Sequence, residues 1–245
     1  MAVDSNSFFK YQEHRGQSGY KAAILVKEQS DTYYSMLVAS ETVPSVFGSN
    51  DSFDFDLLNS PVKGKIMGKM SLDDKEVEVL HHRDNVYRFQ KLKGKVLDFL
   101  VVNQEFVGYK FTGTLSYRMN DATADVLRGT YTITPMSADP NPIMDCTGDI
   151  LETLCFADVI PETMKVVGGT DTGVALSVVQ GTPAGLAYTA YTVSDDYTET
   201  AASSAIVTES GTSYFRPASA GMYVIKADAT GYAGWATTVR VVAAS

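Results

Sequence analysis

The clearest pattern in the chain is an alternation of apolar and polar residues between Val107 and Ala138. In its first half, odd-numbered positions are mostly apolar and even-numbered positions are polar or glycine. The apolar positions are Val107, Tyr109, Phe111, Leu115, Tyr117 and Met119. Successive side chains of a strand point to opposite faces, so this period of two predicts a strand with one dry face and one wet face. The pattern returns at 127–134, and the polar segment 120–125 predicts a hairpin loop.

The length of this predicted strand is unusual. From Val107 to Met119 it would span about 40 Å at roughly 3.3 Å per residue, whereas a typical strand has about five or six residues. Such a strand overreaches a small compact sandwich and fits better in a sheet that continues into neighbouring subunits. A long hairpin in a monomeric sandwich is the alternative, and the pattern alone leaves both open.

Shorter alternating or apolar segments predict further strands on either side. These segments are 20–27, 32–43, 53–57, 61–70, 76–81 and 96–102. A single helix is predicted from Asp84, whose carboxylate can cap the free backbone N–H groups. It would bury Val86, Phe89 and Leu92 and end at Gly94.

The composition changes at about Pro161, after which lysine and arginine become rare. Seven short strands are predicted here, which is typical of an immunoglobulin-like sandwich. Their ranges are 164–167, 175–179, 188–193, 204–207, 213–216, 221–227 and 237–242, and a further strand is expected at 154–157. Tyr223 lies two residues before Ile225, as in the tyrosine corner of such folds, so both are candidate core residues. The predicted fold is all-β with one short helix, with domains at 1–160 (arm 1–19) and 161–245.

Composition and charge narrow the function. The 245 residues carry a formal net charge of −9, which disfavours tight DNA binding because DNA-binding proteins neutralise phosphates with basic patches. The N-terminal residues do not resemble a signal peptide, so synthesis in the cytosol is expected. In that compartment Cys146 and Cys155 are expected to be buried thiols rather than a disulfide.

The motifs that could carry chemistry are weak. His81 and His82 are adjacent and would point to opposite faces of a strand. The acidic segment 50–56 lacks the glycine and closing glutamate of a calcium loop. The glycine-rich segment 168–173 has no lysine and no following helix, unlike a phosphate loop. The sequence therefore predicts a protein that is not an enzyme, with no cofactor and no metal site.

The segment from Arg83 to Ser137 resembles the major tail tube protein of long-tailed phages, especially noncontractile ones. The matching features are Arg83-Asp84-Asn85 opening a short helix, the strand through Asp98-Phe99-Leu100, the run from Gly108 to Tyr117, Asn120-Asp121-Ala122, and the run from Gly129 to Thr134. An appended immunoglobulin-like domain also occurs in this group. Met1 to Gln17 departs from any pattern of the family.

The resemblance implies a tail-tube β-sandwich or barrel that closes into hexameric rings, which stack into a hollow conduit for the genome. The expected location is the virion tail, and the expected partners are other copies, the tape measure protein and tail-end proteins. DNA would pass without specific binding, along a lumen to which Asp54, Asp56, Asp121 and Asp125 contribute. Pro44, Phe47, Asn50 and Asp51 are candidates for contacts between rings. The immunoglobulin-like domain would lie outside the tube, could contact host glycans weakly, and would be dispensable for assembly.

Two other interpretations compete with the tube. One is a two-domain adhesin or carbohydrate-binding surface protein, which would use Tyr197, Tyr214 or Tyr232 as platforms for sugars. The other is a ring protein of a secretion apparatus, which shares the tube fold but seldom carries an appended domain.

Overall fold

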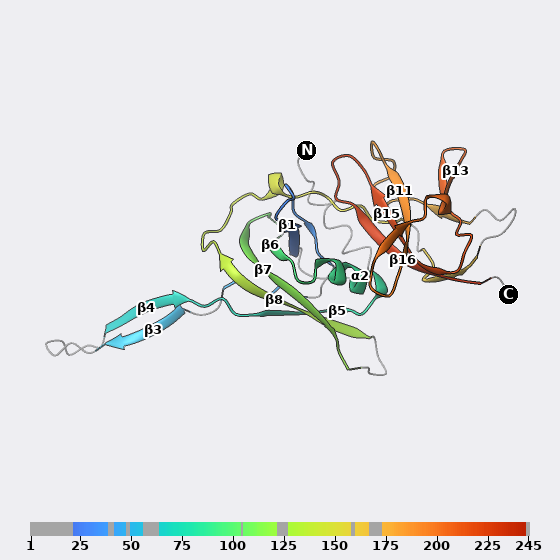
Figure 1. The fold of residues 1–245 in the computed structure, drawn as a ribbon. Helices are drawn as coiled ribbons and strands as arrows, with labels where there is room; N and C mark the ends of the chain where they lie inside the picture. Colours follow the sequence, from blue (N-terminus) through green and yellow to red (C-terminus); the bar gives the residue numbers. More distant parts are fainter. Residues whose placement is uncertain are drawn as a thin grey trace. The chain divides into compact units, whose positions relative to one another are not determined.

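The chain forms two compact units, and their sequence ranges interleave (Figure 1). The computed structural model describes residues 22–38, 42–47, 50–55, 64–103, 105–121, 127–157, 160–166 and 173–243, with 50–55 and 64–70 described by their backbone alone. Described residues within 19–80 and 92–146 form the ribbon unit, and those within 81–91 and 147–245 form the sandwich unit. This division differs from the predicted domains 1–160 and 161–245, because the helix and residues 147–160 group with the C-terminal strands.

The ribbon unit contains a six-stranded antiparallel sheet with the strand order β2-β1-β6-β7-β8-β5. Its strands are β1 (Ala23–Glu28), β2 (Ser35–Met36), β5 (Lys75–Leu80), β6 (Val96–Val102), β7 (Gly108–Met119) and β8 (Arg128–Ala138). In Figure 1, β7 and β8 form a long twisted ribbon that runs beside β5. A separate antiparallel pair is made by β3 (Asn50–Phe55) and β4 (Gly64–Met70).

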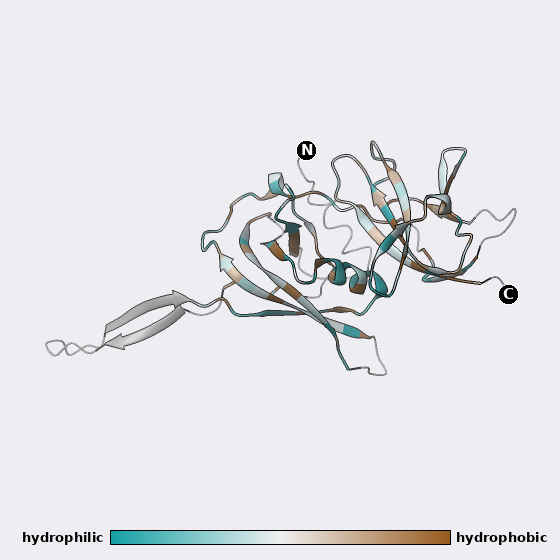
Figure 2. Ribbon diagram, viewed as in Figure 1, coloured by the Kyte–Doolittle hydropathy of each residue, from teal (hydrophilic) through white to brown (hydrophobic). Residues whose placement is uncertain are grey.

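In the middle of β7 and β8, the apolar positions of the sequence pattern are the buried side chains. Phe111 and Leu115 of β7 and Tyr131 and Ile133 of β8 are each at most 4% exposed. Figure 2 shows hydrophobic and hydrophilic residues interspersed along both strands. The dry face is tightly packed, because the rings of Phe99 and Phe111 stack with centroids 5.2 Å apart. The predicted alternation is therefore confirmed at these positions of the 12-residue β7 and of β8. It fails near the turn between the two strands, where Met119 is 57% and Leu127 36% exposed although both were predicted on the dry face.

The sandwich unit packs two sheets against each other. One sheet has the order β12-β11-β15-β16-β9 and the other β10-β14-β13. The strands are β9 (Thr163–Lys165), β10 (Val174–Leu176), β11 (Ala187–Val193), β12 (Glu199–Ala201), β13 (Ile206–Glu209), β14 (Thr212–Phe215), β15 (Gly221–Asp228) and β16 (Trp235–Val242). Leu176 and Phe215 from the smaller sheet share one core cluster with Ile225 and Val239 from the larger sheet.

Tyr223 has the geometry expected of a tyrosine corner. Its ring is 3% exposed within the core, and its hydroxyl donates to the Ser219 carbonyl oxygen at 3.1 Å, four residues upstream. Ile225, two residues further along β15, is fully buried. These contacts and the two packed sheets are features expected of an immunoglobulin-like sandwich.

Some predicted elements differ from the structure. Residues 154–157 form no strand; isolated bridges occur at Thr153 and at Phe156 instead. Between them the Cys155 N–H donates to the Gln180 side-chain oxygen at 3.1 Å and not to a neighbouring strand. The short strand β12 was not predicted, and β13 begins two residues later than expected. Cys146 and Cys155 are both buried and form no disulfide, as expected.

The fold class is all-β with one short helix, α2 (Arg83–Leu92). The helix ends just before Gly94, whose φ of 76° is the left-handed conformation predicted for its stop. Among the described residues, two 3-10 turns, Thr147–Asp149 and Ser203–Ala205, are the other helical segments. Within the described residues, no helix has the length and hydrophobicity needed to cross a membrane.

Candidate functional site

The polar face of the ribbon is the first candidate site. It is formed by the polar residues at even positions within 112–118 of β7 and 128–134 of β8, together with two glutamates of β5. The members are Glu76, Glu78, Thr112, Thr114, Ser116, Arg118, Arg128, Thr130, Thr132 and Thr134. The register places hydroxyl residues directly opposite one another, with Thr114 beside Thr134 and Ser116 beside Thr132. Such pairs favour strand pairing and leave a face rich in uncharged hydrogen-bonding groups.

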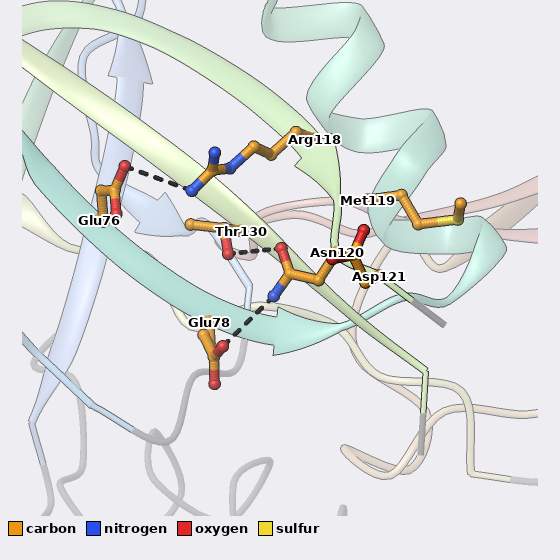
Figure 3. A pocket seen from close by; sticks show the side chains of 7 residues that line it. All are labelled: Glu76, Glu78, Arg118, Met119, Asn120, Asp121 and Thr130. Atoms are coloured by element: carbon orange, nitrogen blue, oxygen red, sulfur yellow. Dashed lines mark hydrogen bonds and ion pairs between the residues drawn. The ribbon is translucent and has the colours of Figure 1, made fainter. Parts of the chain in front are cut away.

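Charges gather at one end of this face, where they pair with each other (Figure 3). The Arg118 guanidinium lies 3.6 Å from Glu76, and the Arg128 guanidinium lies 3.6 Å from Glu78. All four side chains are substantially exposed, so these pairs contribute little to stability. Their effect is to balance charge, because two glutamates face two arginines on the same surface.

Asn120 closes this end of the ribbon with two side-chain hydrogen bonds. Its amide nitrogen donates to Glu78 at 3.2 Å, and its amide oxygen accepts from the Thr130 hydroxyl at 2.8 Å. An open hollow of about 500 Å³ results, lined by Glu76, Glu78, Arg118, Met119, Asn120, Asp121 and Thr130. The hollow is polar and shallow, and its groups are engaged mainly with one another.

The structure brings one of the four predicted lumen aspartates to this face. Asp121 lines the hollow. Asp54 lies in β3, where only the backbone is described, and Asp56 and Asp125 lie outside the described residues. The ribbon face is rich in hydroxyl groups, and its described charges are balanced rather than strongly acidic.

The predicted ring-contact residues are distributed over two places. Pro44 and Phe47 are half-buried, and the Phe47 ring packs edge-on against Tyr109 of the same chain, with centroids 5.2 Å apart. Asn50 and Asp51 belong to β3, where Asn50 pairs with Met70 of β4. Phe47 therefore contributes to the packing of its own unit, and the side chains of the other two are not described.

Sequence reasoning missed Glu76, Glu78, Arg118 and Asn120. The signal was present in the alternation from 75 to 80, because the same period that buries Val77 and Val79 places Glu76 and Glu78 on the opposite face. Which residues of β7 and β8 would meet them depends on register, and a register cannot be obtained from the period alone.

The second candidate site is the place where α2 packs against β16 of the sandwich unit, called the α2 seat below; it includes Asp84, Thr237 and Thr238. Asp84 is 6% exposed, and one carboxylate oxygen accepts from the Thr238 N–H at 2.7 Å and from the Thr238 hydroxyl at 2.6 Å. Its other oxygen accepts from the Thr237 hydroxyl at 3.0 Å. The prediction that Asp84 caps the helix is wrong: the His82 carbonyl accepts the first helical N–H, that of Val86, and the His82 ring accepts the Asp84 N–H at 3.3 Å.

The remaining contacts of α2 explain why its buried face differs from the predicted one. Tyr87 and Phe89 are buried, whereas Val86 is only partly covered. The Arg88 guanidinium lies over the Trp235 ring, 5.0 Å from its centroid. At the start of the helix, Arg83 donates to the Glu162 carbonyl oxygen at 2.8 Å. The helix thus fits the larger sheet of the sandwich through polar and aromatic contacts.

Glu199 anchors the other end of this seat. Lys226 and Lys91 lie 2.6 and 2.9 Å from its carboxylate, and the Tyr87 hydroxyl donates to it. Burial alone would raise the pKa of Glu199, but the hydrogen bonds from Lys226, Tyr87 and Lys91 outweigh it and lower the pKa to about 2. Burial, and then the bond to Glu199, raises the pKa of the Tyr87 hydroxyl. Glu199 is consequently ionised at any physiological pH.

The tyrosines of the sugar-platform alternative already have neighbours within the sandwich unit. Arg216 lies over the Tyr214 ring at 5.4 Å, and the Tyr197 carbonyl accepts from Lys91 at 3.0 Å. Tyr232 packs against a core cluster that includes Trp235.

Comparison of the chain with protein-family models gives no match, and a search among curated proteins finds no relative.

Proposed function

We propose that this chain is the subunit of a bacteriophage tail tube, assembled as hexameric rings that stack into a conduit for the genome. The proposal joins the resemblance over Arg83–Ser137 to a feature of the ribbon sheet, namely that successive strands are displaced along their axis. Closing a sheet into a barrel or tube requires tilted strands with a cumulative stagger of register.

The main support for the proposal is the stagger between the strands that flank β7. β6 pairs with residues 108–114 of β7, a segment centred on Phe111, whereas β8 pairs with residues 111–119, centred on Leu115. The displacement of four residues corresponds to about 13 Å along the strand. β5 then pairs only with residues 128–133 of β8, the half nearest the β7–β8 turn. From β6 to β5 the register is thus displaced in the same direction at each strand, as in a closed sheet of tilted strands.

The polar face suits the lumen of such a tube. Threonine and serine hydroxyls hydrate well, and the arginines of the face are paired with Glu76 and Glu78. DNA affinity grows with the number of phosphates that cations neutralise, so a face with paired cations holds DNA weakly. Asp121, and under the proposal Asp54, Asp56 and Asp125, would add negative charge that repels the passing genome.

The sandwich unit fits the proposal as a domain outside the tube, with host glycans as weak ligands and the tape measure and tail-end proteins as partners of the tube itself. α2 belongs to the sandwich unit, although its sequence lies between two segments of the ribbon unit. We therefore infer that removing residues 161–245 would leave α2 without its packing partners.

Sedimentation velocity over a concentration series tests the proposal. We expect the purified chain to move from a monomer to a species with six times the 26.5 kDa mass of one chain, and then to larger assemblies. A chain that stays monomeric throughout the series would contradict the tube and favour the two-domain surface-binding protein.

A further inference from the structure

The polar face of the ribbon carries side chains of the kinds that contact phosphate. Alternate residues of β7 share this face, and hydroxyl side chains lie between two cations there. In chain order these residues are Lys110, Thr112, Thr114, Ser116 and Arg118. Arginine, lysine, serine and threonine are among the side chains that contact the phosphate oxygens of DNA. Arg118 is 68% exposed, so its guanidinium is accessible to a ligand outside the sheet.

Glu76 and Glu78 of β5 compensate the charge of two arginines on this face. Glu76 lies 3.6 Å from the Arg118 guanidinium, and Glu78 lies 3.6 Å from that of Arg128. The pairing of β5 with β8 places them there, because alternate residues of β5 lie on the polar face. The two glutamates are 60% and 56% exposed, and exposed ion pairs contribute little to stability. Their main physical effect is therefore on the charge of the face.

A third carboxylate has the same relation to a cation elsewhere on this face. Asp98 of β6 lies 3.9 Å from the Lys27 ammonium and accepts from the Thr112 hydroxyl at 2.9 Å. In the sheet register Asp98 lies opposite both Lys27 and Thr112, so the three residues form one row across the polar face. Carboxylates on two strands thus lie beside the cations of a face that is rich in hydroxyl groups.

We propose that Glu76 and Glu78 prevent the polar face from binding a polyanion, and that the ligand class they exclude is the phosphodiester backbone of nucleic acid. DNA affinity comes from cations that replace the counterions of phosphate groups. An arginine whose charge is compensated by a neighbouring carboxylate contributes less to this exchange, and the carboxylate itself repels the phosphate. This inference rests on the proposed function and deepens it, because it assigns the weak hold of the face on DNA to two residues of β5.

The test measures retention of the dilute, full-length protein on DNA–cellulose at about 50 mM salt. It compares Glu76→Gln/Glu78→Gln with a control, Glu105→Gln/Asp195→Asn, which removes two exposed carboxylates outside this face and changes the net charge equally. Glutamine at position 78 keeps an oxygen that can accept from Asn120. We expect the wild type and the control to pass through the column. Glu76→Gln/Glu78→Gln should be retained and should elute by about 200 mM salt, because phosphate contacts weaken steeply over this range.

A third variant tests whether the retention depends on the arginine. Adding Arg118→Gln to Glu76→Gln/Glu78→Gln should abolish most of the retention, because the guanidinium that Glu76 had compensated is then absent. The single variant Glu76→Gln leaves Glu78 and its bond to Asn120 in place. It repeats the comparison should the double variant fail to fold.

The other results overturn the inference. Passage of the folded Glu76→Gln variants through the column would show that the glutamates do not exclude DNA, and would leave the tube proposal standing. Equal retention of the control would overturn it as well, because net charge alone would then explain binding, and so would full retention of the variant that lacks Arg118. Retention of the wild type would instead contradict the low DNA affinity that the proposed function requires.

Discussion

The buried carboxylate of Asp84 should be the strongest single determinant of the α2 seat. Replacing it with alanine leaves the Thr238 N–H, the Thr238 hydroxyl and the Thr237 hydroxyl without their acceptor. A buried donor that loses its partner costs about 1–3 kcal/mol, and bonds to a charged group are at the upper end. The two hydroxyls can rotate toward other acceptors, and removing a buried charge returns part of its desolvation cost. We expect Asp84→Ala to lower the free energy of unfolding of the sandwich unit by about 3 kcal/mol.

Urea unfolding followed by tryptophan fluorescence measures this directly. Trp235 is the only tryptophan, it is 6% exposed, and Arg88 of α2 lies over its ring. With a slope of about 2 kcal/mol/M, the midpoint should fall by about 1.5 M. Asp84→Asn keeps one acceptor oxygen and should cost about 1 kcal/mol. The control, Asp195→Ala, removes an exposed carboxylate of the same unit and should change stability by less than about 0.5 kcal/mol. If Asp84→Ala behaves like this control, α2 is not held by its carboxylate.

Three further perturbations test other contacts of the two units. The pKa of Glu199 is lowered to about 2. Its contribution to the free energy of unfolding is therefore complete above the unfolded pKa of about 4.3 and is lost as the pH falls toward 2. Glu199→Gln should remove about 1–2 kcal/mol of this acid-dependent stability, allowing for the partial solvation of the carboxylate. Gly129→Ala should cost about 1–3 kcal/mol, because its new Cβ would lie 2.1 Å from the Tyr117 hydroxyl oxygen, whereas Gly148→Ala meets no atom within 4 Å and is the control. Deleting residues 161–245 should abolish the helical circular dichroism of α2 and lower soluble yield, because the helix loses its seat.

The results that contradict these expectations are equally specific. An acid unfolding curve that is the same for wild type and Glu199→Gln would show that the Lys226 and Lys91 contacts do not hold the carboxylate in solution. Equal melting temperatures for Gly129→Ala and Gly148→Ala would mean that the Tyr117 ring does not cover Gly129. A truncated chain that keeps its helix and still assembles would show that residues 161–245 are dispensable for assembly.

Periodicity predicted most of the elements of the ribbon unit. The alternation at 107–138 is enough to locate β7 and β8 and to identify their dry faces, because burial on one face forces a period of two. It cannot supply the register, so the meeting of Glu76 with Arg118 and of Glu78 with Arg128 was out of reach. These partners are 42 and 50 residues apart in the sequence, and only strand order and register bring them together.

The helix shows a different limit. A run of the right period and a glycine at its end predicted α2 correctly, yet its partners come from residues more than 70 positions later. Asp84 fits the local rule for a helix cap, and a tertiary partner, the Thr237–Thr238 pair, takes its carboxylate instead. Of the predicted buried face, Phe89 is buried, whereas Asp84 and Tyr87 take the places expected for Val86 and Leu92.

Electron microscopy of the purified, concentrated protein tests the tube most directly. A subunit whose staggered, one-sided sheet is completed by neighbours should form hexameric rings and striated hollow tubes, with an axial repeat no longer than the roughly 40 Å length of a 12-residue strand. Fields of single, well-ordered protomers at every concentration, without rings or tubes, would contradict it.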